Sequence, residues 1–314
     1  MESAARHSPS ASRTALRVTV LAGGPSAERA VSVNSGAAIA DALRRRGHHV
    51  HVADINPTDL SALVRECDVV FPALHGTFGE DGQVQRLMEE RRLRFVGSRS
   101  RASAIAMDKI ATKRIVQGLG VATPEFEEIS ASDFDRGQWR LHVPLVAKPV
   151  DQGSSVDTTV CRTPEEVAPA LERVVKGHGR ALLERFIDGR ELTVGILAGD
   201  ALPPICIQPR QGFYDYHAKY QAEDTEYLFD AGFAPEWLEK LQVMSCKVFE
   251  AVGCRHLARV DWMVDREQRP WFLELNTLPG FTSHSLLPKA AAKAGIPFDA
   301  LCDRLVRMAH EEPA

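Results

Sequence analysis

Acidic and amide side chains recur at alternate positions in two short apolar segments of the sequence. The segments ARVDWMV and WFLEL are rich in β-branched and aromatic residues and flank the polar run DREQR, so they predict an antiparallel β-hairpin. Because side chains alternate along a strand, Asp261 lies on one face of the first strand, and Glu274 and Asn276 share one face of the second. Leu273 and Leu275 are then expected to point into a core.

The three oxygen-bearing side chains, Asp261, Glu274 and Asn276, suit a hard cation such as Mg²⁺, which prefers oxygen ligands. No histidine or cysteine belongs to the set, which argues against zinc. Arg259 shares the face of Asp261. The alternative is a hairpin edge whose polar side chains face water; the neighbouring Trp, Phe and Leu residues and the Pro-Gly turn that follows favour a site.

A second chemical pattern lies in the middle of the chain. Lys148 stands in the apolar strand VPLVAKPV, and the glycine–serine turn DQGSSVD follows it. Such a turn binds phosphate through backbone N–H groups and hydroxyls, while the lysine supplies positive charge. Further along, ERFIDGREL carries Glu184, Asp188 and Glu191, which offer an acid for a ribose beside backbone groups for an adenine.

The N-terminal part predicts a parallel sheet. Strands are expected over LRVTVL, DVVFPAL and RFVG, with helices between them, and ligands of such α/β sheets gather beyond the carboxyl ends of the strands. Glu28 and His75 both follow strands in this way. The turn AGGPSA lacks the GxGxxG spacing of dinucleotide sites. The alternatives are a partner of the helix dipole for Glu28 and a hydrogen-bonded loop histidine for His75.

The rest of the chain alternates long helices with one aperiodic stretch. Helices are expected over MDKIATKRIVQGLG and APEWLEKLQVMSCKVFEAVG, and a helical run from Ser285 onward is expected to pack beneath the hairpin. Residues 208–232 hold all four tyrosines and show no periodicity. Loops of this length are functional lids or disordered segments, and the aromatic residues favour a lid.

Composition narrows the class of protein. The chain has 314 residues, 44% of them hydrophobic, and a formal net charge of -4, which gives no electrostatic case for nucleic acid or an anionic membrane as a partner. The six cysteines form no CxxC pair, which fits scattered thiols in a reducing compartment. No apolar run is long enough to cross a bilayer, and residues 1–15 are expected to be a disordered tail, with a transit peptide as the alternative. We therefore expect small-molecule substrates and a cytoplasmic location.

Eight motifs in order resemble the D-alanine–D-alanine ligases of the ATP-grasp superfamily. They are SAERAVSVNSG, ALHGTFGEDGQVQ, MDK, AKP with QGSSV, ERFIDGRELTVGIL, FYDYHAKY, RVDWM and LELNTLPGFTSHSLLP. The resemblance runs from about residue 16 to the end and implies α/β and α+β regions in an ATP-grasp fold. Its domains would be an N-terminal parallel-sheet domain (16–106), a central domain (107–193) and a C-terminal domain (194–314) with the lid at 208–232.

The resemblance also implies roles for individual residues. Asp261, Glu274 and Asn276 would hold two Mg²⁺ or Mn²⁺ ions, and Arg259 and the Gly280 amide would stabilise an oxyanion. The residues that match the ATP site are Lys109, Lys148, Ser154, Glu184, Ile187, Glu191 and Lys219. The residues that match the substrate and catalytic positions are Glu28, His75, Ser154, Tyr220, Ser285 and Leu286.

The implied reaction joins two D-alanines for peptidoglycan precursor synthesis. ATP would phosphorylate the first D-alanine to an acyl phosphate, the amine of the second would attack it, and a closed lid would exclude water. The AKY of the lid resembles the dipeptide-forming members and favours D-alanine as acceptor. The family implies a homodimer through the N-terminal domain. The alternatives are a ligase for another D-amino acid or D-hydroxy acid acceptor, and a nucleotide-binding protein of this fold without catalysis.

A few positions depart from the usual pattern of the family. Asp157 stands where glycine commonly follows GSSV, His217 stands where an acid is common, and Phe229-Asp230 replaces a Cys or Thr followed by proline. Glycine adopts backbone angles that aspartate adopts less readily, so Asp157 is expected to alter the phosphate-binding turn or to weaken ATP binding. His217 is expected to make the lid sensitive to pH near neutrality.

Overall fold

The structure is a computed structural model, and it describes residues 14–154, 156–208 and 226–313. The N-terminal region contains a three-stranded parallel sheet in the order β2-β1-β3, which confirms the predicted α/β class. Its buried strands β1 and β3 were predicted, but RFVG forms only a single bridge, between Val70 and Phe95. The third strand is instead β2, a half-exposed edge strand that follows the turn at Gly47. The elements are β1 (Arg17–Leu21), α1 (Arg29–Arg45), β2 (His49–Ala53), a 3-10 helix (Ser61–Leu63), β3 (Val69–Pro72), α2 (Gln83–Glu90) and α3 (Ser100–Met107).

The central region is an antiparallel sheet in the order β4-β7-β5-β6. Apolar residues of α6 and of the sheet form one hydrophobic core, and α6 begins with Pro164 in its first turn, where a missing N–H costs nothing. The elements are α4 (Lys109–Gly118), β4 (Phe126–Ser130), α5 (Ala131–Asp135), β5 (Leu145–Pro149), β6 (Thr159–Cys161), α6 (Pro164–His178) and β7 (Arg180–Arg185).

The C-terminal region is an antiparallel sheet in the order β11-β10-β8-β12-β13, with β9 paired to β8. The helix α8 covers this sheet through a second core that includes Trp262 and Leu241, and it ends at Gly253, whose left-handed conformation caps the helix as expected. The elements are β8 (Gly189–Leu197), β9 (Asp200–Ala201), β10 (Ile205–Gln208), β11 (Glu226–Leu228), α8 (Pro235–Val252), β12 (Leu257–Asp265), β13 (Pro270–Asn276), α9 (Leu286–Lys293) and α10 (Phe298–Glu311).

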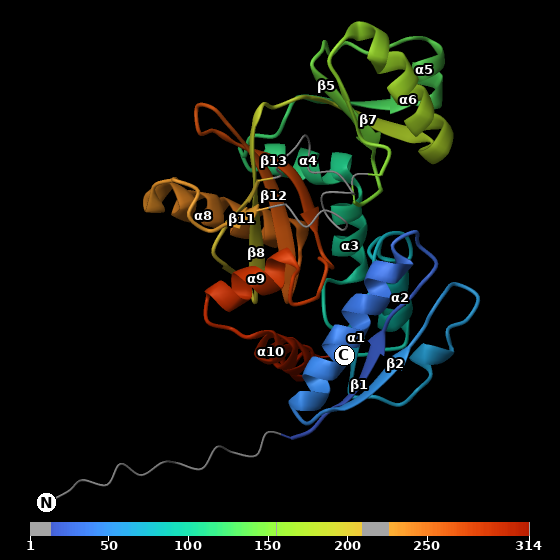
Figure 1. The fold of residues 1–314 in the computed structure, drawn as a ribbon. Coiled ribbons are helices and arrows are strands. Elements are labelled where there is room, and N and C mark those ends of the chain that lie inside the picture. Colours follow the sequence, from blue (N-terminus) through green and yellow to red (C-terminus); the bar gives the residue numbers. More distant parts are fainter. Residues whose placement is uncertain (1–13, 155, 209–225, 314) are drawn as a thin grey trace, which may run out of the picture.

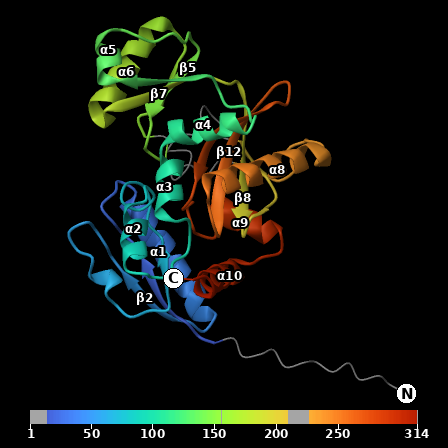
Figure 2. The ribbon, with the colours of Figure 1, turned by 180° about the vertical axis from the view of Figure 1, so that it is seen from behind.

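The three regions follow one another along the length of the molecule. The central sheet with α5 and α6 lies at one end, the parallel sheet with α1 and α2 lies at the other, and β12, β13 and α8 lie between them (Figures 1 and 2). The division into three domains stays a prediction, and β8 runs across the predicted boundary between residues 193 and 194.

The hairpin of β12 and β13 has the register that the alternation of side chains predicts. Arg259 pairs with Asn276, and Asp261 pairs with Glu274. The prediction for Leu273 is wrong, because the register shifts by one residue after Asp261. This β-bulge leaves Leu273 beside Glu274 on the pocket side, and Phe272 is buried instead.

One predicted helix forms and another is broken in the structure. The helix predicted from Met107 forms as α4, which begins after Asp108, whose side chain accepts a hydrogen bond from the Ala111 N–H and caps the helix. The C-terminal run is divided at Gly295, which has φ of 82°, into α9 and α10. The helix α9 packs on the C-terminal sheet, at β8. The helix α10 packs on α1 and β3 of the N-terminal region, so the prediction that the whole run lies beneath the hairpin is wrong for α10.

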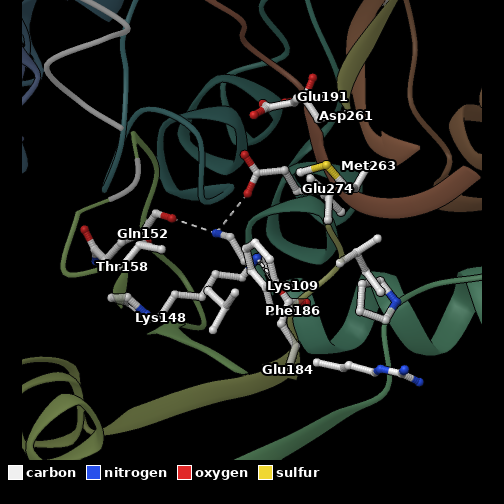
Figure 3. A pocket seen from close by; sticks show the side chains of 16 residues that line it. Lys109, Lys148, Gln152, Thr158, Glu184, Phe186, Glu191, Asp261, Met263 and Glu274 are labelled. Atoms are coloured by element: carbon white, nitrogen blue, oxygen red, sulfur yellow. Dashed lines mark hydrogen bonds and ion pairs between the residues drawn. The ribbon is translucent and has the colours of Figure 1, made fainter. Parts of the chain in front are cut away.

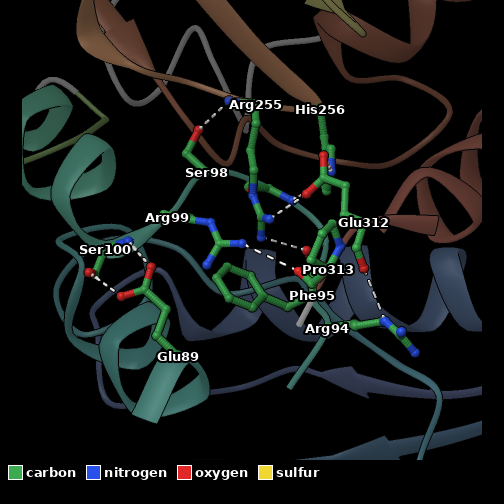
Figure 4. A network of polar contacts seen from close by, with 11 residues as sticks. Glu89, Arg94, Phe95, Ser98, Arg99, Ser100, Arg255, His256, Glu312 and Pro313 are labelled. Carbon is green, nitrogen blue, oxygen red and sulfur yellow. Dashed lines mark hydrogen bonds and ion pairs between the residues drawn. The ribbon is translucent and has the colours of Figure 1, made fainter. Parts of the chain in front are cut away.

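A group of charged residues near the C-terminus joins the start of β12 to the N-terminal region (Figure 4). Arg255 donates to the carbonyls of Phe95 and Gly97 and forms an ion pair of 2.6 Å with Glu312. His256 is 3% exposed. Its ring lies between the Gly97 N–H, at 3.1 Å, and the Glu312 carboxylate, at 2.8 Å. We call Arg255, His256 and Glu312 the C-terminal clamp.

Candidate active site

A pocket between the central and C-terminal sheets contains most of the residues predicted to bind nucleotide and metal. Its floor comes from β5 and β7, its opposite wall comes from β12 and β13, and the linker between β7 and β8 closes one end. The predicted residues that line it are Lys109, Lys148, Glu184, Ile187, Glu191, Asp261 and Glu274. We call this the nucleotide pocket.

Lys109 connects the two walls of the nucleotide pocket (Figure 3). Its Nζ donates to the Gln152 carbonyl at 2.6 Å and lies 3.6 Å from a carboxylate oxygen of Glu274. Lys109 is the first residue of α4, and its own N–H donates to the Val150 carbonyl, so the backbone fixes the base of the side chain. Burial lowers the pKa of Lys109, which means that the protein interior destabilises its charge and a phosphate would stabilise it.

Glu184 lies on β7 at the floor of the pocket and is 3% exposed. Lys148 contacts one of its oxygens at 2.5 Å, and Lys113 contacts the other at 2.9 Å. Burial works against the charge of Glu184, but the two lysines outweigh it and hold the pKa of the carboxyl below its usual value. Burial alone would lower the pKa of Lys148, and the attraction of Glu184 and Glu274 outweighs burial and raises it. Lys148 is therefore a charged group at a pocket that suits an anion.

The carboxylates of the hairpin fit the predicted cation in chemistry and place. Asp261 and Glu274 are direct cross-strand neighbours and both line the nucleotide pocket, and Asn276 is two residues further along the same edge of β13. Arg259 donates three hydrogen bonds to Asp261, and the Thr193 hydroxyl donates to Asp261 at 2.6 Å. Among the described residues, no group of three or more His, Cys, Asp or Glu side chains could hold a metal ion.

A second pocket, of about 480 Å³, lies between the N-terminal region and the hairpin. The predicted residues that line it are Glu28, His75, Ser154, Arg259, Glu274, Asn276, Gly280, Ser285 and Leu286. We call this the substrate pocket. Glu274 lines both pockets, so the two spaces meet at its carboxylate.

Acidic groups dominate the N-terminal wall of the substrate pocket. Glu28 is the residue that precedes α1, and its carboxylate accepts a hydrogen bond from the Ser154 hydroxyl of the glycine–serine turn. It makes no capping hydrogen bond to α1, which disfavours the purely local role for Glu28. His75 is held at Nε2 by Ser35 at 3.4 Å. Burial alone would lower the pKa of His75, but Glu80 and Glu28 outweigh it and raise the pKa.

The opposite wall is the start of α9. Ser285 is the residue that precedes α9, and its Oγ accepts the Thr282 N–H at 3.0 Å, so its side chain does not cap the first N–H groups of the helix. A Cβ on Gly280 would lie 3.3 Å from the Ser285 Oγ, so the turn is already closely packed. A helix start of this kind attracts a carboxylate.

Three residues of the predicted lid lie outside the part of the chain that the structure describes. Lys219, Tyr220 and His217 lie outside the described residues, as does most of the predicted lid. The ends of that lid are strands, because Gln208 closes β10 and residues 226–228 form β11, which pairs with it. The prediction of one structureless stretch from 208 to 232 is wrong at these ends.

Asp157 lies outside both pockets. It has φ of 50°, and its carboxylate binds the His178 ring at 2.8 Å, so the side chain turns toward the end of α6. The pocket wall at this turn is formed by Thr158. The carboxylate that the sequence placed beside the phosphates therefore has a hydrogen-bonding partner away from the pockets.

Sequence reasoning missed several residues that the structure brings to the site. Thr193 shares a face of β8 with Glu191, and the alternation of the strand was a signal for it. Lys113 follows Lys109 by one helical turn in MDKIATK, and Glu80 follows His75 in the same loop. Each lies within a motif that was noted for another residue.

Two antiparallel sheets that face each other across lysines and paired carboxylates define an ATP-grasp fold, and solved structures with this chain arrangement confirm the class. The family described as "D-ala D-ala ligase C-terminus" matches residues 115–307, and "D-ala D-ala ligase N-terminus" matches residues 54–98. The D-alanine–D-alanine ligase B of Chromobacterium violaceum is 41% identical over 296 residues, which are 94% of this chain and 98% of that protein.

Solved structures agree with the sequence matches. The D-alanine–D-alanine ligase of Bacillus anthracis, solved in complex with ATP, has a TM-score of 0.79 and 30% identity and covers 94% of this chain and 97% of that one. The VanG D-Ala:D-Ser ligase of Enterococcus faecalis has a TM-score of 0.82 and 25% identity and covers 94% of this chain and 100% of that one. The chain belongs to the D-alanine–D-alanine ligase family, as the motifs predicted.

Proposed function

We propose that the protein joins two D-alanines to D-alanyl-D-alanine at the cost of ATP, for the synthesis of peptidoglycan precursors. The observation that carries this proposal is the position of Glu274, which lines both pockets. The phosphate end of a bound nucleotide would therefore meet the carboxylate of an amino acid at this residue. The names of the relatives support the same reaction and do not favour the non-catalytic alternative.

The chemistry requires activation of a carboxylate. A carboxylate oxygen of the first D-alanine would attack the γ-phosphorus of ATP, and the bond to ADP would break to leave D-alanyl phosphate. The amine of the second D-alanine would then attack the acyl carbon, lose a proton and expel phosphate. Lys109 and Lys148 lie where they would offset the phosphate charge, and Lys219 would reach the γ-phosphate from the lid.

The substrate pocket offers a partner for each charged group of the amino acids. Glu28 would hold the ammonium of the first D-alanine, with His75 behind it. Ser285, Leu286 and the start of α9 would bind the carboxylate of the second. Arg259 and the Gly280 N–H would stabilise the tetrahedral oxyanion, and Tyr220 with Ser154 would link the lid to this site.

Asp261, Glu274 and Asn276 would hold two Mg²⁺ or Mn²⁺ ions, whose contribution is to neutralise the triphosphate. Glu184, Ile187 and Glu191 would hold the adenosine, with Ile187 contributing backbone groups from the linker between β7 and β8. The hard oxygen donors and the place of the two carboxylates in the nucleotide pocket support this assignment.

The direct test measures phosphate release from ATP and Mg²⁺ with D-alanine, L-alanine, D-serine or D-lactate, with mass spectrometry of the products. We expect D-alanyl-D-alanine with D-alanine alone, and no product from Asp261→Ala or Glu274→Ala. A mixed product with D-serine or D-lactate as the preferred acceptor would replace the acceptor assignment. ATP binding without product from any pair would support the regulatory alternative.

We also propose a homodimer and a cytoplasmic location. Val33 of α1 and Val52 of β2 are exposed by 45% and 39% and line one shallow groove, which supports an interface on the N-terminal region. Val33→Asp is expected to halve the mass in light scattering, and an unchanged mass would exclude this face. The need for ATP supports the cytoplasmic location. Among the described residues, no helix is long and apolar enough to cross a membrane.

A further inference from the structure

Lys113 is a fully buried lysine outside both pockets. It lies on α4 one turn after Lys109, it is 0% exposed, and it lines neither pocket. Its Nζ reaches three groups from separate segments: the Glu184 carboxylate at 2.9 Å, the Thr123 hydroxyl at 2.7 Å and the Phe272 carbonyl at 3.3 Å. An isolated buried ammonium is costly, so a lysine in this place requires its partners.

The charges around Glu184 show what Lys113 adds. Glu184 carries one negative charge and touches Lys148 and Lys113 through different oxygens. With Lys148 alone, the buried carboxylate would form a neutral pair. With Lys113 behind it, the three groups carry a net positive charge, and Lys148 and Glu184 both line the nucleotide pocket while Lys113 does not. The second lysine therefore leaves the first with charge to offer an anion.

We propose that Lys113 is a positioning residue for nucleotide binding, which balances Glu184 from behind so that the Lys148 ammonium is available to the phosphates of ATP. This inference rests on the proposed function, because it assigns a task to a residue beneath the same pocket. Lys113 never touches the nucleotide and acts through Glu184.

The contact with β13 gives Lys113 a second effect in the same direction. Thr123 donates to the Phe272 carbonyl at 2.8 Å, and Lys113 donates to the same carbonyl. Phe272 lies opposite the bulge of the hairpin and two residues before Glu274. Lys113 thus ties the floor of the pocket, at β7, to the wall that carries the carboxylates.

The test compares Lys113→Met with Thr123→Val. Lys113→Met keeps the length and apolar volume of the side chain but removes the charge. Thr123→Val removes a hydroxyl at the same buried junction and keeps both lysines. We expect Lys113→Met to weaken binding of ATP about tenfold or more, as measured by calorimetry without D-alanine, and to leave the KM for D-alanine within about twofold. Thr123→Val is expected to change ATP binding by less than about threefold.

A pH profile separates the electrostatic effect from packing. Burial lowers the pKa of Lys113 to about 8, while Glu184 and Glu274 oppose this shift and Lys148 adds to it. As pH rises from 7 to 9, Lys113 loses its proton, Glu184 is left to Lys148 alone, and the affinity for ATP should fall. In Lys113→Arg the charge persists, so the fall in affinity should be smaller and the affinity at pH 7 should be restored toward the wild type.

The outcomes are distinct from those of the proposed function, because ATP binding is measured without turnover. Equal losses of ATP affinity in Lys113→Met and Thr123→Val would overturn the inference in favour of packing. Unchanged ATP affinity in Lys113→Met would also overturn it. Where Lys113→Met does not fold, identical pH profiles for the wild type and Lys113→Arg would overturn it. A protein that binds ATP as expected but forms no dipeptide would contradict the proposed function alone.

Discussion

Two groups of charged residues, one before β12 and one between α4 and the central sheet, have different roles. In the C-terminal clamp, Arg255, His256 and Glu312 bind one another and backbone groups of the N-terminal region. At the nucleotide pocket, Glu184 binds Lys113 and Lys148, and positive charge remains. Balanced charge stabilises a junction, whereas two lysines around one buried carboxylate leave a cation available to a ligand.

The largest expected effect is the loss of kcat when the carboxylate shared by the two pockets is removed. Glu274→Gln removes the carboxylate at which the two pockets meet, and we expect kcat to fall about a thousandfold or more, since charge stabilisation at the transferred phosphoryl is lost. The free energy of unfolding should change by less than about 1 kcal/mol, because the side chain is partly exposed. Steady-state kinetics and urea unfolding measure both. A folded Glu274→Gln enzyme with near-normal kcat would contradict the role of this residue.

The next largest effect is a loss of stability when the carboxylate of the C-terminal clamp is removed. Glu312→Ala leaves Arg255 and the buried His256 without their carboxylate, and we expect a loss of about 1–2 kcal/mol in the free energy of unfolding. The kcat of the folded protein should stay within about twofold, because Glu312 lines neither pocket. Urea unfolding and dipeptide formation are measured on the same preparation, with the exposed Glu311→Ala as the matched control. Equal stability of the two variants would remove the clamp as a stabilising feature.

The C-terminal clamp should also make the free energy of unfolding depend on pH. The Gly97 N–H donates to Nδ1 of His256, so the ring is neutral and donates from Nε2 to Glu312. Burial and the nearby Arg255 lower the pKa of His256 below its usual 6.5. The unfolded chain therefore binds a proton that the folded chain does not, and the free energy of unfolding should fall as pH drops below about 6.5. In His256→Gln this part of the fall should vanish; an identical slope from pH 7 to 5 would contradict it.

The smallest expected effect concerns the contact between Asp157 and His178, which lies outside both pockets. Asp157→Gly removes the contact with His178, which at a half-exposed site is worth about 0–1 kcal/mol, and it relieves a positive φ by a similar amount. The two effects oppose each other, so the KM for ATP should change by less than about threefold. His178→Ala removes the contact without relieving the backbone, and it should raise this KM more than Asp157→Gly does. The reverse order would show that the charge of Asp157, not its contact, matters.

The parts of the site that depend on local periodicity could be predicted from the sequence. Strand alternation placed Asp261 and Glu274 on one face, and the register of β12 and β13 confirms it. The bulge that turns Leu273 toward the pocket has no local signal, because it arises from the pairing of two strands. Lys113 was missed for a related reason: its partners come from three segments that are distant in sequence, and only the folded chain shows that it is buried.

The packing of α10 bears on how the chain acquires its fold. One hydrophobic core contains Val18 of β1 and Phe71 of β3 together with Leu305 and Val306 of α10. The apolar residues of the first strand are therefore not fully covered until the last helix has been synthesised. Domains usually fold in order as they are synthesised, but here the core of the N-terminal sheet stays incomplete until the chain is nearly finished. A chain released before residue 298 should therefore aggregate, and the two ends of the protein should unfold as one cooperative unit.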